Sequence, residues 1–207
     1  PSDPDPDAIR VSGKPLRSAV PPRYLLLNKP AGCVTTRDDE AGRRTVFDLI
    51  PARLRPGLHA VGRLDYQTEG LLLLTTDGEF ANRVAHPRFG CRKTYHVKVR
   101  GRPSEAALER LRRGMKLHGR QLAGAVVRPL QVRGPRQGKS NSWWSVELAE
   151  GRTRQIREMF HRIGHPVQRL RRVAIGRLSD SSLPRGGYRE LTEAEVVQLM
   201  GGERGRR

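Results

Sequence analysis

One loop between two apolar segments constrains this chain most. Leu58–Val61 has the composition of a short strand, and Leu71–Leu74 is an unbroken apolar run that is too short for an ordinary helix. The segment between them carries Asp65 among glycines and polar residues, which predicts a loop held at both ends by buried strands. Such a loop can present a reactive side chain from a rigid support. The alternative is that Asp65 only bonds the amides of its own turn, as Asp often does.

The charge of the chain indicates a polyanionic partner. The 207 residues include 40 Lys plus Arg against 21 Asp plus Glu, a formal net charge of +19. The basic residues are mostly Arg, which binds phosphate through two parallel hydrogen bonds and stacks on bases. No stretch reaches the roughly 18 apolar residues of a membrane span, and the start has no signal-peptide pattern. We therefore expect a cytoplasmic nucleic-acid partner and no membrane; the alternative is a solvated basic surface.

Metal and cofactor chemistry have no support in the residue pattern. Cys33 and Cys91 are too few for a disulfide framework, and no His has ligand spacing to them. No phosphate-binding loop or dinucleotide motif is present. We expect both cysteines to be small buried hydrophobes in a reducing compartment, with no metal and no cofactor.

Strand and helix patterns alternate without a repeat, which predicts an α+β fold with a mixed or largely antiparallel sheet. We expect a strand stopped by a turn over 24–32, and strands over 93–100, 121–133, 142–149 and 170–175. We expect helices after the caps Asp77, Ser104, Thr153 and Thr192, with a shorter one over 45–50. Residues 134–139 form a basic loop, and one of the adjacent Trp143 and Trp144 is expected to be buried.

An ordered series of motifs resembles the pseudouridine synthases. Gly62-Arg63-Leu64-Asp65, with Thr68 and Gly70 after it, is similar to the catalytic motif of that family. Further matches follow in the family's order: Lys93–Val97, Glu150–Arg157, Gly164–Val167, Leu170–Arg172 and Gly186–Thr192. The resemblance is closest to the RsuA/RluB type, the branch that modifies bacterial ribosomal RNA, and within it to the large-subunit enzymes.

The resemblance implies a fold and a domain plan. The fold is a central curved sheet, mixed or largely antiparallel, flanked by helices, with the active-site cleft between its two halves. Residues 21–200 would form the catalytic domain. Residues 1–20 would be the remnant of, or linker to, a small RNA-binding domain, with a disordered arm as the alternative. Residues 201–207 would be a disordered basic tail.

The resemblance also assigns site residues. Asp65 would be the essential carboxylate, Arg157 its basic partner, and Tyr95 the ring against the uracil. Residues expected to contact the substrate RNA are Arg63, Leu170, Lys29, Lys93 and Arg154. From the strand pattern alone, packing in the core is the more usual fate of Tyr95.

The implied activity is isomerisation of one uridine to pseudouridine in ribosomal RNA, by a monomer. A non-catalytic rRNA-binding or ribosome-assembly protein is the alternative that uses the same basic cleft. A glycoside hydrolase is a third interpretation, but it requires two carboxylates flanking the bond. Only Glu69 and Asp77 are candidates for the second, and only if the fold brings them to Asp65.

Overall fold

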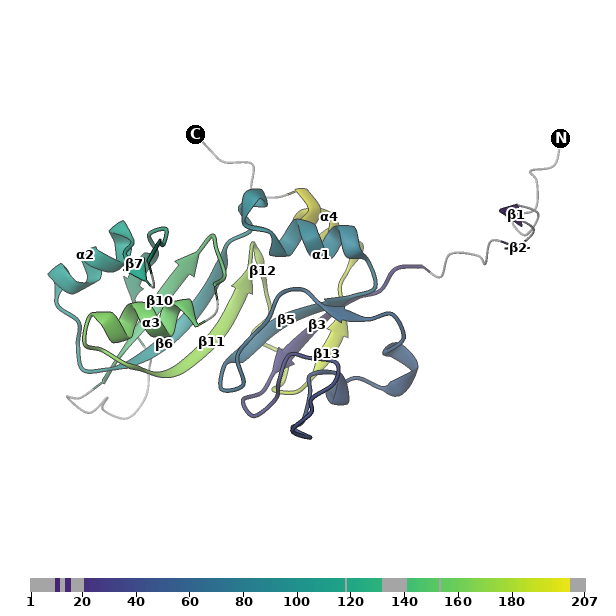
Figure 1. The fold of residues 1–207 in the computed structure, drawn as a ribbon, viewed down its shortest axis with the longest axis horizontal. Coiled ribbons are helices and arrows are strands. Elements are labelled where there is room, and N and C mark those ends of the chain that lie inside the picture. The colour runs from purple at the N-terminus through teal and green to yellow at the C-terminus, as the bar shows by residue number, and fades with distance from the viewer. Residues whose placement is uncertain are drawn as a thin grey trace.

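Nine strands form one mixed sheet in the computed structural model, which describes residues 10–11, 14–15, 21–117, 119–131, 141–152 and 154–201. β5 and β11 run parallel, and the other pairs are antiparallel (Figure 1). β4 pairs with β5, and β12 with β11. The strands along the sheet are, in order, β13 (Tyr188–Glu190), β3 (Tyr24–Lys29), β5 (Glu69–Thr75), β11 (Val167–Ile175), β6 (Lys93–Arg100), β10 (Asn141–Leu148) and β9 (Val126–Pro129); β4 is His59–Ala60 and β12 is Leu178–Ser179.

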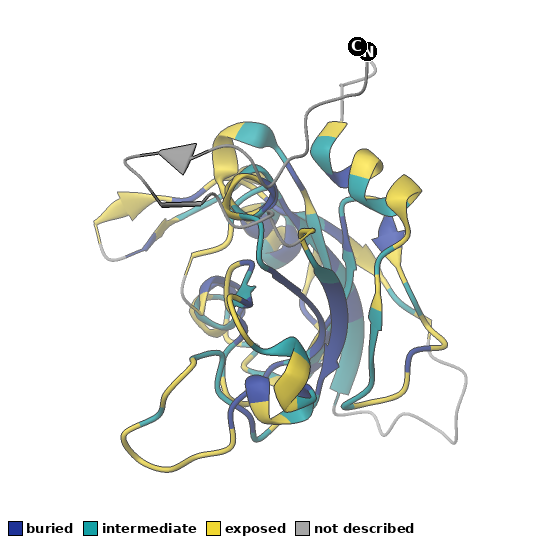
Figure 2. Cartoon of the chain, turned by 90° about the vertical axis from the view of Figure 1, so that its right-hand side faces the viewer, coloured by how far each residue is buried: buried dark blue, intermediate teal, exposed yellow. Residues whose placement is uncertain are grey.

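The half of the sheet formed by β13, β3 and β5 is covered on both faces. Leu26, Leu71 and Leu73 pack under α1 (Gly78–Ala85) and α4 (Glu193–Gly201). The alternating leucines of the same strands pack on the other face, against the short 3₁₀ helices η2 (Phe47–Leu49) and η3 (Ala52–Leu54) and their flanking loops. A strand buried on both faces reads as a continuous apolar run, which explains the four leucines of β5 (Figure 2).

The other half, formed by β11, β6, β10 and β9, carries its helices on one face. α2 (Glu105–Arg113) and α3 (Gln155–Arg162) pack on this face, which presents Val97, Val99 and Trp144 to them. Two irregularities in the β11–β6 register, near Gln168 and Val173, supply the bend of the curved sheet. The remaining elements of the structure are η4 (Pro87–Phe89), the pair β7 (Lys116–Leu117) and β8 (Arg120–Gln121), and the pair β1 (Arg10–Val11) and β2 (Lys14–Pro15).

Most predicted caps are confirmed. The Asp77 carboxylate accepts hydrogen bonds from the Glu79 and Phe80 amides at 2.9 and 3.0 Å. Ser104 caps α2, and a reciprocal box between Thr192 and Glu195 opens α4. These local hydrogen bonds depend only on neighbours in sequence, so the pattern was sufficient to find them.

Two helix predictions need correction. Residues 45–50 do contain the reciprocal Thr45–Asp48 bonds, but only a single 3₁₀ turn, η2, follows them. The helix expected from Thr153 begins at Gln155, after Arg154, whose φ of 55° is left-handed. Thr153 itself lies outside the described residues. A left-handed residue cannot continue a helix, so α3 starts only after it.

Several other predictions meet the structure only in part. The strand expected over 121–133 is confirmed as β9 and a short β8, while the basic loop 134–139 lies outside the described residues. Of residues 1–20 only β1 and β2 are described, as an antiparallel pair. Residues 202–207 are also outside the described chain, and Gly201 belongs to α4 rather than to a tail.

Buried side chains agree with the sequence on three smaller points. Cys33 and Cys91 lie in two different core clusters, as expected of small hydrophobes. Trp144 is the buried tryptophan of its pair. No helix in the described part of the chain is long and apolar enough to cross a membrane.

The two halves of the sheet meet where β5 and β11 exchange a short parallel contact, Gly70 opposite Arg172. A Cβ on Gly70 would lie 2.1 Å from the Arg172 carbonyl oxygen and 2.7 Å from its nitrogen. Gly70 also has φ of +107°, which side chains rarely adopt. Arg172 reinforces the junction, since its Nε donates to the Leu71 carbonyl at 2.6 Å. Only glycine therefore allows this closeness.

We expect Gly70→Ala to lower the free energy of unfolding by roughly 3 kcal/mol or more, because its methyl must push the two halves apart. Urea unfolding followed by circular dichroism measures the change. Gly78→Ala is the matched control, because nothing lies within 4 Å of its added Cβ and its φ is not left-handed. Equal effects from both substitutions would contradict a steric role for Gly70.

Candidate active site

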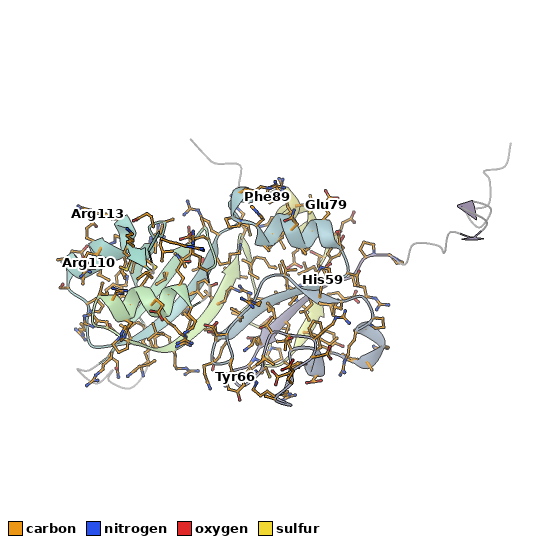
Figure 3. All side chains as sticks on the ribbon, in the orientation of Figure 1. His59, Tyr66, Glu79, Phe89, Arg110 and Arg113 are labelled. Carbon is orange, nitrogen blue, oxygen red and sulfur yellow. The ribbon has the colours of Figure 1, made fainter. Side chains whose placement is uncertain are left out.

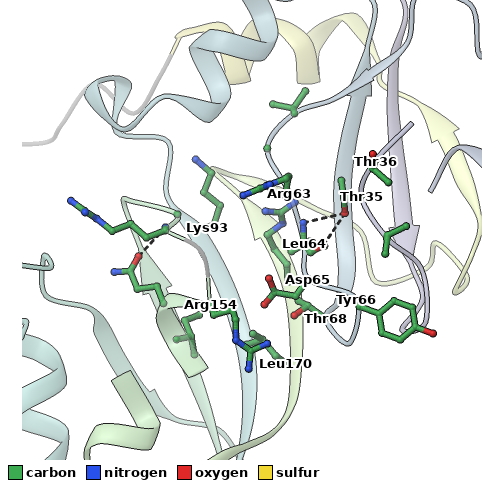
Figure 4. A pocket seen from close by; sticks show the side chains of 18 of the residues that line it. Thr35, Thr36, Arg63, Leu64, Asp65, Tyr66, Thr68, Lys93, Arg154 and Leu170 are labelled. Atoms are coloured by element: carbon green, nitrogen blue, oxygen red, sulfur yellow. Dashed lines mark hydrogen bonds between the residues drawn. The ribbon is translucent and has the colours of Figure 1, made fainter. Parts of the chain in front are cut away.

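A cavity of about 790 Å³ opens between the two halves of the sheet. It takes residues from the Asp65 loop, from the strands β6 and β11, and from the start of α3. Figure 4 shows Asp65, Arg63 and Thr68 on one side of this space and Lys93, Arg154 and Leu170 toward the other. The predicted cleft between two halves is thus confirmed, and its size is typical of a small-ligand site.

Asp65 and Arg157 form the charged pair of this site. The Arg157 Nε lies 3.9 Å from the Asp65 Oδ2, with side chains that are 14% and 30% exposed. Burial, and next the neighbouring charge of Arg154, lower the pKa of Arg157, while Asp65 opposes them. Arg157 remains a cation at any working pH. The guanidinium thus places a positive charge beside the Asp65 carboxylate in a partly closed cavity.

The floor of the cavity is apolar. Tyr95, Leu148, Ile156 and Leu170 line it from β6, β10, α3 and β11. Tyr95 touches the core clusters of both halves, so its ring lies at the junction between them. A flat ring and three aliphatic side chains near a carboxylate suit a planar, uncharged group with a polar edge.

Lys29 does not face a substrate, contrary to the prediction from the sequence. Its side chain is fully buried. Its Nζ lies 3.2 Å from the Asp65 carbonyl oxygen, 3.3 Å from that of Tyr66 and 2.8 Å from that of Thr68, and 3.0 Å from that of Pro30. The ammonium therefore fixes the backbone of the Asp65 loop from the core side. The apolar strand before it, with no acid nearby in sequence, gave no sign of this role.

Two more residues after β3 hold the loop, and neither was predicted. Thr35 Oγ1 donates to the Leu64 carbonyl at 2.8 Å and also lies 3.3 Å from the Leu64 nitrogen. The Gly32 amide donates to the Tyr66 carbonyl at 2.9 Å. These contacts join segments about thirty residues apart in sequence. Only the tertiary fold brings them together.

The other predicted substrate residues differ in how freely they face the cavity. Arg63 and Arg154 are exposed and line it, as does the buried Leu170. Lys93 lines it too, but its ammonium already donates to the Val84 and Cys91 carbonyls at 2.9 and 2.7 Å. Lys93 thus fixes the start of β6, and its pKa is lowered by burial.

Three buried polar atoms at this site have no hydrogen-bond partner among the described residues. They are Thr68 Oγ1, Arg157 Nε and Arg172 Nη2. Thr68 and Arg172 line the cavity, and Arg157 faces Asp65. Buried donors without partners are uncommon and cost free energy unless a ligand satisfies them. Their presence at one cavity marks it as a candidate binding site. Arg172 lies in the motif Leu170–Arg172, but the motif gave it no role of its own.

The two candidates for the second carboxylate that a glycoside hydrolase would require beside Asp65 are engaged elsewhere. Glu69 pairs with Arg169 and Arg185 at 3.3 and 3.6 Å. Asp77 caps α1 and accepts a hydrogen bond from the Tyr24 hydroxyl at 2.7 Å. Neither lines the cavity. Within the described ranges, no group of three His, Cys, Asp or Glu side chains is placed to hold a metal ion.

The chain belongs to the RNA pseudouridylate synthase family, whose profile matches residues 23–162. Ribosomal large subunit pseudouridine synthase B of Bacillus subtilis (strain 168) is 41% identical over 196 residues, covering 93% of this chain and 77% of the relative. An uncharacterized RNA pseudouridine synthase of Aquifex aeolicus (strain VF5) is 38% identical over 203 residues, covering 96% and 77%.

Solved structures agree with this assignment. A crystal structure of a pseudouridylate synthase matches with a TM-score of 0.77 at 34% identity, covering 86% of this chain and 74% of that one. Human RNA pseudouridylate synthase domain containing 1 matches with a TM-score of 0.55 at 19% identity, covering 90% and 93%, and so shares the fold. The family and fold expected from the motifs are therefore confirmed.

We expect Lys29→Met to destabilise the protein by roughly 3 kcal/mol and to loosen the Asp65 loop, because four carbonyl oxygens lose their shared donor. Urea unfolding reports the first effect. Amide hydrogen exchange over residues 62–69 reports the second. Lys116→Met, at an exposed lysine of β7, is the control and should change neither.

The stability difference between the native protein and Lys29→Met should also depend on pH. Burial lowers the pKa of Lys29 from 10.5 to about 8. Between these values the unfolded chain binds one more proton than the folded chain, so the stability contributed by Lys29 rises with pH. From pH 8 to 10.5 the native protein should gain up to roughly 3 kcal/mol relative to Lys29→Met. A pH-independent difference would refute the lowered pKa.

Proposed function

We propose that this protein isomerises a uridine to pseudouridine in ribosomal RNA of the large subunit. The observation that carries the proposal is the Asp65 carboxylate beside the Arg157 guanidinium, above an apolar floor at the junction of the two halves. The name of the Bacillus subtilis relative supports the large-subunit substrate. The family supports the reaction type.

The reaction needs no external reagent. The bond from ribose C1′ to uracil N1 breaks, the base turns, and a bond forms from C1′ to C5. C5 then loses a proton and N1 gains one, so electrons and atoms balance without a redox cofactor. Asp65 would act by attacking C1′, by attacking the base, or by removing the 2′ hydrogen. Each route requires an ionised carboxylate beside the ribose, which the charge of Arg157 supports.

The remaining residues would hold the nucleotide. The target must leave its stack to enter a cavity of about 790 Å³. Tyr95 and Leu170 would pack against the uracil ring while it turns. The unpaired donors of Thr68 and Arg172 are placed for its polar edge or for the ribose. Arg63 and Arg154 lie exposed at the cavity and suit the flanking phosphates.

The setting of the reaction follows from its substrate. Ribosomal RNA is a cytoplasmic polyanion, and the net charge of +19 favours its capture. We propose that the protein acts as a monomer, because the cavity is lined by both halves of one chain. Residues 21–200 would form its catalytic domain, and the segment before them a connection to further RNA contacts.

Asp65→Asn should abolish the release of tritium from uracil C5 in unmodified large-subunit rRNA, to below about one thousandth of the native rate, because the amide cannot act as nucleophile or base. Asp38→Asn is the control, since it removes the same charge from another exposed carboxylate at the cavity and should retain activity. Tritium release by Asp65→Asn would refute the mechanism. RNA binding by the native protein without release would instead favour a non-catalytic rRNA-binding role.

A further inference from the structure

The half of the sheet that carries α2 and α3 on one face leaves its other face open. Val97, Val99, Trp144 and Val146 point into the core beneath the helices. Their neighbours in the strands point the opposite way, because side chains alternate across a sheet. Directly opposed residues share a face, so the register assigns its members. We call this surface the outer face; it includes Thr94, His96, Lys98, Arg100, Val126, Arg128, Asn141, Trp143, Ser145, Glu147, Arg169 and Arg171.

No residue of the outer face is buried within the structure described, unlike the core face of the same strands. Arg100, Arg128, Arg169 and Arg171 are exposed, and the others are half-buried, as expected on a pleated surface without a covering layer. Figure 1 shows α2 and α3 together on one side of β6 and β10. The apolar floor of the cavity lies on that same side of the sheet, because Tyr95 and Leu170 pack with the core beneath the helices.

The outer face is strongly basic. Five of its residues are cations, and Glu147 is its one acid among the residues assigned to it. Glu147 is already paired with Arg92 at 2.8 Å, and Arg169 turns to Glu69 at 3.3 Å. The other four cations, Lys98, Arg100, Arg128 and Arg171, form no ion pair with a described residue. Such a surface attracts a polyanion.

Trp143 lies within this charged surface. Trp143 belongs to β10 and lies opposite Lys98 of β6. Two residues further along β10, Ser145 lies opposite Arg128 of β9. Its neighbour Trp144 fills the core and donates its Nε1–H to Ser142 at 2.9 Å. Trp143 does not belong to that core cluster. Its side chain is partly exposed, on the same face as Lys98 and Arg128. An aromatic side chain flanked by Lys and Arg on an open sheet is the arrangement by which proteins stack nucleic-acid bases.

We propose that the outer face is a second RNA-binding surface, which holds a segment of the substrate outside the cleft. A base of an unpaired segment stacks on Trp143, while Lys98, Arg128 and Arg171 contact its phosphates. This inference rests on the proposed function for the identity of the RNA. The outer face and the apolar floor of the cavity lie on opposite sides of the sheet. A single RNA strand therefore reaches both only by passing around an edge of the sheet. A short stem-loop fills the cleft alone, and a longer fragment also reaches the outer face.

The test combines Trp143→Leu with Lys98→Gln and Arg128→Gln. Affinity is measured for two RNAs, a short stem-loop with the target uridine and a longer rRNA fragment around it. We expect the triple variant to bind the long fragment at least tenfold more weakly, through lost stacking and two lost phosphate contacts. The salt slope of log K should fall by about 1.4, for two contacts to a single strand. Binding of the stem-loop and turnover at saturating RNA should stay unchanged.

Arg110→Gln with Lys116→Gln is the control, because it removes the same charge from exposed positions of α2 and β7. Figure 3 shows Arg110 on α2, at the edge of the molecule. Equal affinities of the triple variant and this control for the long fragment would overturn the proposal. An equal loss on both RNAs would also overturn it, because the effect would then come from the cleft or the fold.

The failure of this proposal can be distinguished from the failure of the proposed function. If native protein releases no tritium but loses affinity for the long fragment only in the triple variant, the enzymatic activity fails and the outer face stands. If tritium is released and the triple variant binds as the control does, the activity stands and the outer face fails. Quenching of tryptophan fluorescence by the long fragment, absent in Trp143→Leu alone, gives a direct readout of stacking.

Discussion

The structure depends on a short parallel contact between two strands. β5 belongs to the half with α1 and α4, β11 belongs to the half with α2 and α3, and they share only two paired positions. The absence of a side chain at Gly70 brings them together, and Arg172 crosses the joint to the Leu71 carbonyl. Asp65 sits just before β5, while Leu170 lies on β11 and Arg157 on the helix before it. The distance between carboxylate and guanidinium is therefore set by this joint.

A buried charge then fixes the loop. Placing an ammonium in a core is costly, and it is tolerated where good hydrogen bonds compensate. Lys29 supplies donors to the carbonyls of Asp65, Tyr66 and Thr68, where a water-filled gap or an apolar side chain could not define one conformation. Thr35 and Gly32 add neutral contacts to the same backbone. These contacts restrain the backbone of the loop on several sides, which is the support that a precisely positioned functional side chain requires.

The features that could be predicted from the sequence are those that depend on residues close together in the chain. The leucine run of β5, the Asp77 and Ser104 caps and the alternation of β6 are short-range patterns, and all are confirmed. The motif resemblance reached the family and placed Asp65 and Arg157 together. It failed for Lys29, which the pattern could not distinguish from a surface lysine. It passed over Thr35, and it included Arg172 in a motif without giving it a role. Those roles arise from contacts between distant segments, and neither periodicity nor spacing encodes them.

The unpaired donors around Asp65 have a thermodynamic consequence. Thr68 Oγ1, Arg157 Nε and Arg172 Nη2 are buried on folding, and no described residue compensates these three atoms with a hydrogen bond. A substrate with acceptors in the right places supplies that compensation on binding. The site is thus kept less stable than the fold would allow, and apolar replacements there would trade recognition for thermal resistance. Selection for heat tolerance and selection for turnover would act on these three side chains in opposite directions.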